Sequence, residues 1–164
     1  MVIIVMGVSG CGKTTVGKLL SKETGLPFFD ADDFHPPENV RKMKSGQPLN
    51  DTDRQPWLEN LSAKISEWNR SGGAILACSA LKEAYRETLS SGKGEKEFVY
   101  LKGSRSVIFD RMKKRDGHFM PTELLDSQFE ALEEPEEAIT ISINQSPEII
   151  VHEIVNHPKL LHLT

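Results

Sequence analysis

The chain has 164 residues, 38% of them hydrophobic and 27% charged, and its formal net charge at pH 7 is −4. This composition is typical of a soluble globular protein, the length predicts a single domain over residues 1–164, and the acidic balance argues against a general affinity for nucleic acid. The presence of just two cysteines, without any apolar run near the roughly 20 residues of a membrane helix, predicts a cytoplasmic location and no membrane contact.

The first predicted element is a buried strand, Val2–Met6, which leads into the sequence GVSGCGKT at 7–14. These eight residues fit the phosphate-binding pattern of Gly, four residues of any kind, Gly, Lys and Ser or Thr. A helix follows, with apolar residues three and four apart from Val16 onward and an expected end near Gly25. Glycines let backbone N–H groups curl around phosphate oxygens, and the helix N-terminus adds unpaired donors. The expected nucleotide contacts are Gly7, Ser9, Gly10, Cys11, Gly12, Lys13, Thr14 and Thr15.

Three side chains of this loop have predicted chemical properties. Lys13 would reach the β- and γ-phosphates and act on the charge of the transferred phosphoryl group, and Thr14 would offer its hydroxyl to Mg²⁺. The thiol of Cys11 would lie close to the phosphates, where the helix N-terminus favours its thiolate form. The loop therefore predicts ATP and Mg²⁺ as cofactors.

A short acidic segment follows the second predicted strand, residues 27–30. Because ligands of parallel α/β sheets bind at the carboxyl ends of the strands, these carboxylates are expected beside the phosphate loop. Of Asp30 and Asp32, one would hold Mg²⁺ through water, and the other would accept the hydrogen bond and the proton of an acceptor hydroxyl. Helix capping is the alternative role for both, and Asp33 is expected to cap a helix or face solvent. His35 would bind a sugar hydroxyl or stabilise the turn.

Residues 36–73 contain two predicted helices with a turn between them. A double proline opens a short polar helix over 38–46, and the stretch 49–54 (LNDTDR) is rich in turn residues. Arg54 in this stretch would bind an anion or pair with a neighbouring aspartate. A longer helix then ends at a glycine pair, and its apolar face, expected in the core, consists of Trp57, Leu61, Ile65 and Trp68.

Three further apolar or alternating runs, at 74–78, 98–101 and 139–143, are predicted strands. A helix around Leu125 has no clear cap, whereas the other helices of this half are expected to begin at the N-cap residues Ser79, Ser104 and Ser146. The alternation of strands and helices along the chain predicts an α/β fold, in which one parallel sheet is covered on both faces.

Two pairs of basic residues near the strand ends are further candidates. Lys82 and Arg86 are four residues apart, and either reach into the cleft or decorate a surface helix. Arg111 and Arg115 are also four apart, just before a break at Gly117. They would lie on a flap that closes over ATP, or on a solvated basic face.

These residues favour a small-molecule kinase over other proteins with a phosphate loop. A GTP switch needs an Asp-x-x-Gly sequence and an Asn-Lys-x-Asp sequence, and neither occurs in the chain. A small-molecule kinase must neutralise the transferred phosphoryl group, orient the acceptor hydroxyl and accept its proton. Lys13 and one of the two carboxylates, Asp30 or Asp32, would meet these needs.

Several stretches together resemble the gluconokinase family of small ATP-dependent kinases. They are MGVSGCGKTTVG (6–17), DADDFHPPENVRKMKSGQPLNDTDRQPWL (30–58), ACSALKEAYRETL (77–89), YLKGS (100–104) and GHFMPTELLDSQFEALE (117–133). The resemblance implies a P-loop fold of the nucleoside-monophosphate-kinase and shikimate-kinase type: three layers, a five-stranded parallel sheet in the order 2-3-1-4-5, and a mobile lid around 111–125. It also implies ATP-dependent phosphorylation of D-gluconate at its terminal hydroxyl to 6-phospho-D-gluconate, commonly by a homodimer.

The resemblance also suggests roles for individual side chains. By position, Asp30 looks like the family's metal-side carboxylate and Asp32 like the acceptor-side one. Arg54 and Lys82 look like contacts of the substrate carboxylate, and Arg111 and Arg115 look like lid residues near the nucleotide. The predicted catalytic residues are therefore Lys13, Asp32 and Arg115. Cys11 replaces the serine usual in relatives, and we expect activity to survive because the backbone does the phosphate work there. The predicted substrate contacts are Asp32, His35, Arg54, Lys82, Arg86 and Gln128.

Two alternatives stay open at this point. One is a kinase for another small polyol acid such as shikimate, against which the stretches DDFHP and NDTDRQPWL argue. The other is a non-catalytic nucleotide-binding module, which would require Asp30 and Asp32 to lie far from the phosphate loop.

Overall fold

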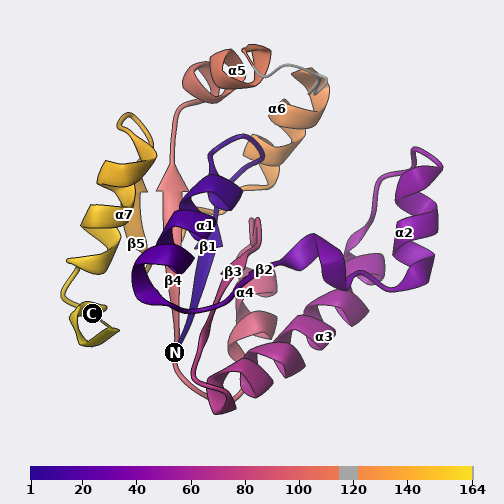
Figure 1. The fold of residues 1–164 in the computed structure, drawn as a ribbon. Coiled ribbons are helices and arrows are strands. Elements are labelled where there is room, and N and C mark those ends of the chain that lie inside the picture. Colours follow the sequence, from indigo (N-terminus) through magenta and orange to yellow (C-terminus); the bar gives the residue numbers. More distant parts are fainter. Residues whose placement is uncertain (115–121, 164) are drawn as a thin grey trace.

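The fold is centred on a sheet of five parallel strands in the order β2-β3-β1-β4-β5 (Figure 1). The computed structural model describes residues 1–114 and 122–163. This sheet confirms the predicted α/β class and the strand order that the family resemblance implies. The strands are β1 (Val2–Met6), β2 (Phe28–Asp30), β3 (Ala74–Ala77), β4 (Lys96–Lys102) and β5 (Ile139–Ser142).

Helices connect the strands in sequence and pack on both sides of the sheet. The α-helices of the described chain are α1 (Lys13–Thr24), α2 (Pro37–Lys44), α3 (Asp51–Arg70), α4 (Glu83–Ser90), α5 (Arg105–Lys113), α6 (Thr122–Ala131) and α7 (Pro147–Val155). Two 3₁₀-helices, η1 (Ala31–Phe34) and η2 (Leu161–Leu163), complete the described elements.

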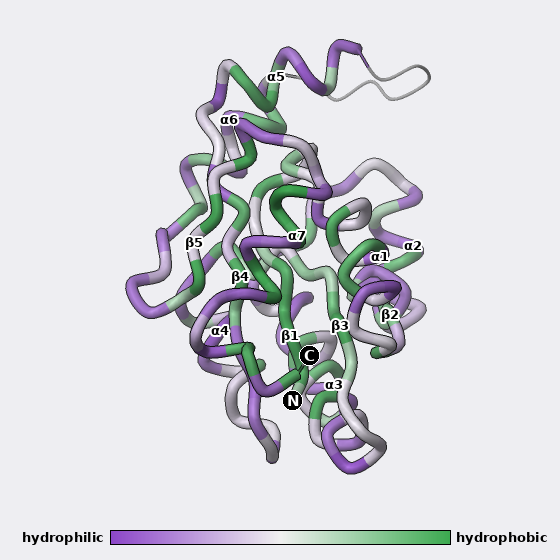
Figure 2. The backbone as a smooth tube through the Cα atoms, turned by 60° about the vertical axis from the view of Figure 1, so that its left-hand side comes forward, coloured by the Kyte–Doolittle hydropathy of each residue, from purple (hydrophilic) through white to green (hydrophobic). Residues whose placement is uncertain are grey.

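The alternating side chains of β1 divide the core into two layers. All five residues of this strand are buried, and Figure 2 shows it in the green of hydrophobic residues. Ile3 and Val5 pack in one cluster with side chains of α1 and α7, whereas Ile4 and Met6 pack in the other with side chains of α3 and α4. A strand that is apolar on both faces therefore lies at the centre of the sheet, as predicted for a parallel sheet covered by helices.

Most predicted helix ends are confirmed by their capping geometry. Gly25 ends α1 in the left-handed conformation with φ 79°. The hydroxyls of Ser104 and Ser146 accept hydrogen bonds from the N–H groups of Val107 and Ile149 at the starts of α5 and α7. These serines satisfy donors that the first helical turn leaves unpaired.

Two predicted boundaries are wrong. The stretch 49–54 is not a turn throughout, because α3 already begins at Asp51, where Asn50 and Asp53 form a reciprocal capping box. Helix α4 begins at Glu83 and not after Ser79, since Ala80 has a φ of 46° and the backbone before Glu83 is not helical. The segment 79–82 is instead an irregular connection that reaches the phosphate loop.

Helices α5 and α6 lie beyond the carboxyl end of β4, at the edge of the sheet where the loop after β1 also emerges (Figure 1). Among the helices of the described chain, none is both long and apolar enough to cross a membrane.

Candidate active site

The loop between β1 and α1 depends on backbone conformations that favour glycine. Gly10 and Gly12 have φ angles of 82° and 101°. At Gly10, a Cβ atom would also lie 2.8 Å from Cγ of Met112 in α5. The N–H group of Gly7 donates to the carbonyl oxygen of Ser79 at 3.2 Å, which ties the loop to the segment after β3. The chain thus curls around the N-terminus of α1, as anion binding requires.

The side chains of the first turn of α1 lie where nucleotide phosphates are expected. The Nζ atom of Lys13 donates to the carbonyl oxygens of Gly7 at 3.0 Å and Val8 at 3.1 Å. Thr14 and Thr15 are exposed. The ammonium group is therefore held over the loop, and two hydroxyl-bearing residues face solvent beside it.

The prediction of a reactive thiolate at Cys11 is wrong. The residue is 1% exposed, and its Sγ atom packs so closely under the loop that a Cβ atom on Gly7 would lie 2.7 Å from it. Burial raises the pKa of the Cys11 thiol, and the nearby charge of Lys13 lowers it by less. Cys11 is a small buried packing group, and its contribution to the loop is its backbone.

From the second half of the chain, Gln128 contacts the phosphate loop, and Arg111 lies within electrostatic reach of it. Ser9 N–H donates to Oε1 of Gln128 at 2.6 Å, and Nε2 of Gln128 donates to the Ser9 hydroxyl at 2.8 Å. The guanidinium of Arg111 donates to the carbonyl oxygen of Ile143, and its charge reaches Cys11, whose pKa it lowers. Gln128 therefore lies on the nucleotide side in this structure, and its contact with the substrate stays a prediction.

The acidic turn after β2 carries both predicted carboxylates. Asp30 accepts a hydrogen bond from the N–H group of Asp32 at 2.9 Å, so it caps η1. The side chain of Asp32 is 84% exposed. Partial loss of hydration raises the pKa of Asp32 above its usual value, Asp30 raises it further, and His35 and Lys13 lower it. The influence of Lys13 indicates that the carboxylate lies within electrostatic reach of the phosphate loop.

An aromatic contact from α3 holds this turn in place. Nε1 of Trp57 donates to the carbonyl oxygen of Ala31 at 2.8 Å, and the Trp57 ring stacks on the ring of His35 with centroids 4.4 Å apart. Nδ1 of His35 contacts the amide nitrogen of Asn39 at 3.2 Å, and its Nε2 lies 3.9 Å from Asp32. Burial lowers the pKa of His35, which favours the neutral ring. Trp57 is a core residue, as predicted, and it also orients the acidic turn.

Arg54 and Lys82, the two predicted carboxylate contacts, meet at one carboxylate of the protein. Asp51 lies 3.5 Å from Nη1 of Arg54 and 3.2 Å from Nζ of Lys82. The hydroxyl of Tyr85 donates to Asp51 at 2.5 Å and accepts from Arg54 at 3.3 Å. The charge of Arg54 also lowers the pKa of His35. This cluster therefore lies on the side of the acidic turn that His35 occupies.

A family model described as shikimate kinase matches residues 9–157. A probable gluconokinase of Xenopus tropicalis is 45% identical, with 94% of this chain and 91% of that protein covered. A gluconokinase of Gluconobacter oxydans is also 45% identical, with 94% of this chain and 89% of that protein covered. The chain belongs to the gluconokinase family. The crystal structure of a gluconokinase from Sinorhizobium meliloti superimposes with a TM-score of 0.83 at 44% identity, and covers 93% of this chain and 87% of that one.

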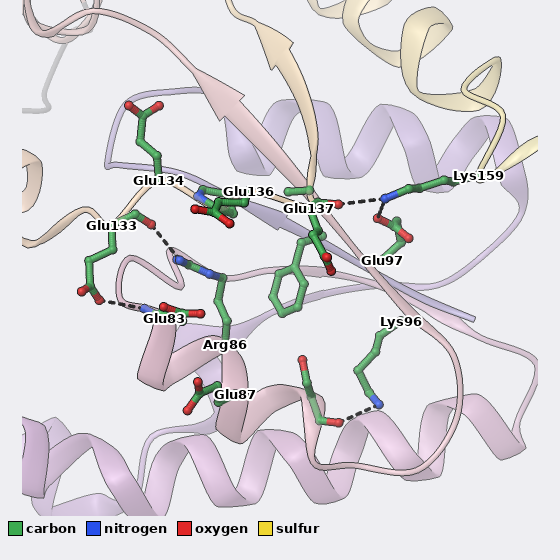
Figure 3. A pocket seen from close by; sticks show the side chains of 14 residues that line it. Glu83, Arg86, Glu87, Lys96, Glu97, Glu133, Glu134, Glu136, Glu137 and Lys159 are labelled. Carbon is green, nitrogen blue, oxygen red and sulfur yellow. Dashed lines mark hydrogen bonds and ion pairs between the residues drawn. The ribbon is translucent and has the colours of Figure 1, made fainter.

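In this member of the gluconokinase family, Arg86 has a different environment from Arg54 and Lys82. It is 8% exposed, and its guanidinium donates to the carbonyl oxygens of Ala80, Leu81 and Glu133. It lines a pocket of about 650 Å³ formed by α4, the start of β4 and residues 133–138, where Figure 3 shows it pointing to Glu133. This geometry joins two loops, and substrate binding by Arg86 stays a prediction.

The remaining gluconokinase predictions fall partly outside the described residues. Arg115 and the break at 117–121 lie there, so the proposed lid is described only for its flanking helices α5 and α6. Among the residues described, no group of three or more His, Cys, Asp or Glu side chains could hold a metal ion. A magnesium site built on Thr14 and Asp30 would therefore need oxygen ligands from the nucleotide and from water.

The acceptor side of the site comprises the turn after β2, the start of α3 and the segment before α4. Three of its residues were not predicted as site residues. Asp51 and Tyr85 hold the two cations, and Asn39, 4% exposed, joins His35 to the backbone of Asp53 through hydrogen bonds of its side-chain amide. The spacing of Asn50 and Asp53 in the sequence fits a capping box and would have indicated the helix start at Asp51. The position of Tyr85 opposite α3 depends on the tertiary fold.

Proposed function

We propose that this protein transfers the γ-phosphoryl group of ATP to the terminal hydroxyl of D-gluconate, giving ADP and 6-phospho-D-gluconate. The observation that carries the proposal is the succession of groups along the site. The phosphate loop with Lys13 follows β1 and the turn with Asp32 follows β2, so both lie at the carboxyl edge of the parallel sheet β2-β3-β1. Asp32 lies 3.9 Å from Nε2 of His35, and the His35 ring stacks on Trp57 of α3, one helical turn after Arg54. A phosphate site, a base and a cationic end thus follow one another in the order that an elongated sugar acid needs.

The nucleotide end would bind ATP mainly through the backbone. The N–H groups of the loop and the N-terminus of α1 would donate to the phosphate oxygens, and Lys13 would exchange its bonds to Gly7 and Val8 for bonds to the β- and γ-phosphates. Arg111 and Arg115 would contribute positive charge on the lid side. Each donor acts most strongly where charge develops during transfer.

Magnesium fits the residues at this end, because Thr14 offers an exposed hydroxyl and Asp30 a carboxylate at the end of the neighbouring strand. These two residues would hold the ion, Asp30 through water, and the bound ion would neutralise phosphate charge. A cytoplasmic location, which the use of cysteine favours, and a homodimer, which the family resemblance implies, are part of the same proposal.

Asp32 would act as the general base. The terminal oxygen of gluconate forms a bond to the γ-phosphorus, the bond from this phosphorus to the bridging oxygen of ADP breaks, and the hydroxyl proton passes to Asp32. The raised pKa of Asp32 supports this role, because a stronger base accepts the proton more readily. Neutral His35 would hydrogen-bond a sugar hydroxyl, and Arg54 and Lys82 would hold the carboxylate at the far end of the chain.

The test is an ADP-release assay with ATP and a panel of acceptors: gluconate, sorbitol, glucose and shikimate. We expect gluconate to give the highest kcat/KM, with a product identified by NMR as phosphorylated at C6. The same assay is run on Asp32→Asn, which removes the proposed base. Asp33→Asn is its matched control, since Asp33 is an exposed neighbour in the same turn. Preference for shikimate, or release of ADP without any phosphorylated acceptor, would contradict the proposal.

A further inference from the structure

Asp51 contacts every polar group of the cationic cluster. Its carboxylate pairs with Arg54 one helical turn later, with Lys82 from the segment before α4, and with the hydroxyl of Tyr85. The hydrogen bond from Tyr85 and the pairing with Lys82 lower the pKa of Asp51, and the same contact raises the pKa of Lys82. Asp51 and Lys82 are therefore both ionised near neutral pH, beside the guanidinium of Arg54.

The cluster carries a defined net charge. Arg54 and Lys82 contribute two positive charges and Asp51 one negative charge, which leaves one positive charge. The adjacent carboxylate of Asp53 does not change this balance, because it is paired with Lys42 at 2.6 Å. The lowered pKa of His35 keeps the nearest histidine neutral.

Tyr85 fixes the relative position of the two cations. The guanidinium carbon of Arg54 lies 5.8 Å and Nζ of Lys82 5.6 Å from the centroid of the Tyr85 ring, so both cations contact the same aromatic ring. The side chains of Arg54 and Lys82 remain 32% and 37% exposed. The arrangement holds them together and leaves part of each open to a ligand.

We propose that Asp51 and Tyr85 are positioning residues that set the cationic end of the site to one net positive charge, and thereby match it to the single carboxylate of a monoanionic sugar acid. The inference rests on the proposed function, in which Arg54 and Lys82 bind that carboxylate. Asp51 acts through the two cations. An acceptor without charge would leave one positive charge unpaired, and an acceptor with a doubly charged end group would exceed the charge available.

The experiment compares three acceptors that share a free primary hydroxyl at C6 of a six-carbon chain and differ in the group at C1: gluconate, neutral sorbitol and sorbitol 1-phosphate. The assay is run at pH 8, where the phosphate ester is a dianion. The variants are Asp51→Asn, which removes the charge, Asp51→Glu, which keeps it, and Tyr85→Phe, which removes only the hydroxyl. Glu67→Gln is the control, since it breaks the i,i+3 ion pair with Lys64 elsewhere on α3.

We expect Asp51→Asn to shift the ratio of kcat/KM for sorbitol 1-phosphate over gluconate by about tenfold toward the dianion, the size of one charge-assisted contact. Asp51→Glu should restore most of the wild-type ratio. Tyr85→Phe should raise the KM for gluconate several-fold with little change in kcat, and Glu67→Gln should change neither quantity. A purely structural role of Asp51 would lower activity toward all acceptors together.

Two results would overturn the inference, and they are distinguishable. In the first, wild type prefers gluconate to sorbitol, but Asp51→Asn leaves the ratio of kcat/KM for the dianion over gluconate unchanged, or raises kcat/KM for gluconate alone. Asp51 then does not set the charge of the site. If wild type uses gluconate and sorbitol equally well, the carboxylate is not recognised, and the proposed function fails together with the inference.

Discussion

The phosphate loop and the acceptor side of this site are built in opposite ways. The loop is one continuous stretch, 7–14, and works through backbone donors whose directions are set by glycine conformations. The acceptor side joins the turn after β2, the start of α3 and the segment before α4, and works through side chains that hold one another. A local pattern therefore suffices to define the first region, whereas the second exists only in the folded chain.

The two regions also differ in how their charges are balanced. At the loop, Lys13 donates to the carbonyl oxygens of Gly7 and Val8 and forms no ion pair with the described residues, so its positive charge is available to a ligand. On the acceptor side, Arg54 and Lys82 are already paired with Asp51. We therefore expect substitutions at the loop to act on the transfer step, and substitutions on the acceptor side to act on the recognition of the acceptor.

The largest expected effect is that of Lys13→Ala. Removal of a cation that acts on developing charge should lower kcat by about 10³-fold, while the fold survives because the lysine side chain is only partly buried. Single-turnover kinetics and thermal unfolding test the two parts of this expectation. Lys18→Ala, an exposed lysine of the same helix, should be neutral. Near-normal turnover of Lys13→Ala would contradict the assignment of a catalytic function to the loop.

Asp32→Asn is expected to lower kcat by about 10²-fold or more, with little change in the affinity for ATP. Because the pKa of Asp32 is raised above its usual value, the acid limb of the wild-type rate profile should lie above pH 3.8 and disappear in the variant. The same shift means that ionised Asp32 slightly destabilises the fold at neutral pH, an effect that vanishes below the unfolded-state pKa. Asp32→Asn should therefore not lower the Tm. A loss of ATP affinity without a loss of turnover would mean that Asp32 has the metal role and Asp30 the role of the base.

Trp57→Phe tests whether α3 holds the acidic turn. The substitution keeps an aromatic ring but leaves the carbonyl of Ala31 without its donor, which should cost about 1–3 kcal/mol of unfolding free energy. It should also lower kcat/KM per folded molecule, because His35 and Asp32 lose their support. Trp68→Phe is the matched control, since Trp68 lies on the same apolar face but stacks on Phe29. Equal losses of activity in both variants would mean that Trp57 contributes through packing alone.

The smallest effect is expected at Cys11. Its buried thiol with a raised pKa should react slowly with iodoacetamide, at the same rate with and without ATP. Cys11→Ser should keep activity, because phosphate contact at this position belongs to the backbone. Fast alkylation that ATP prevents would mean that the thiol is reachable from the nucleotide site.

The sequence was sufficient for the strands, the sheet order and the phosphate loop, because each depends on local periodicity, on glycines or on a family pattern. Two helix starts were predicted wrongly. At Asp51 the turn-forming residues belong to a capping box that begins α3, and after Ser79 the positive φ of Ala80 prevents a helix from starting there. The prediction of a thiolate at Cys11 is wrong because the loop buries this side chain. Burial raises the pKa of the thiol, which the N-terminus of α1 was expected to lower. One of the two predicted roles of Arg54, pairing with a neighbouring aspartate, is confirmed by its contact with Asp51 three residues earlier. The contacts of Asp51 with Lys82 and Tyr85 could not be predicted from spacing, since they require tertiary packing.

The most direct test of the account is the ratio of kcat/KM for gluconate over sorbitol, measured in wild type and in Arg54→Ala, with the exposed Arg41→Ala as control. A charge-assisted contact contributes about 1.5–3 kcal/mol, or roughly 10- to 100-fold. We expect wild type and Arg41→Ala to prefer gluconate strongly, and Arg54→Ala to narrow the preference by that factor through a higher KM for gluconate, with ATP unaffected. Equal use of gluconate and sorbitol by the wild-type protein would contradict the account.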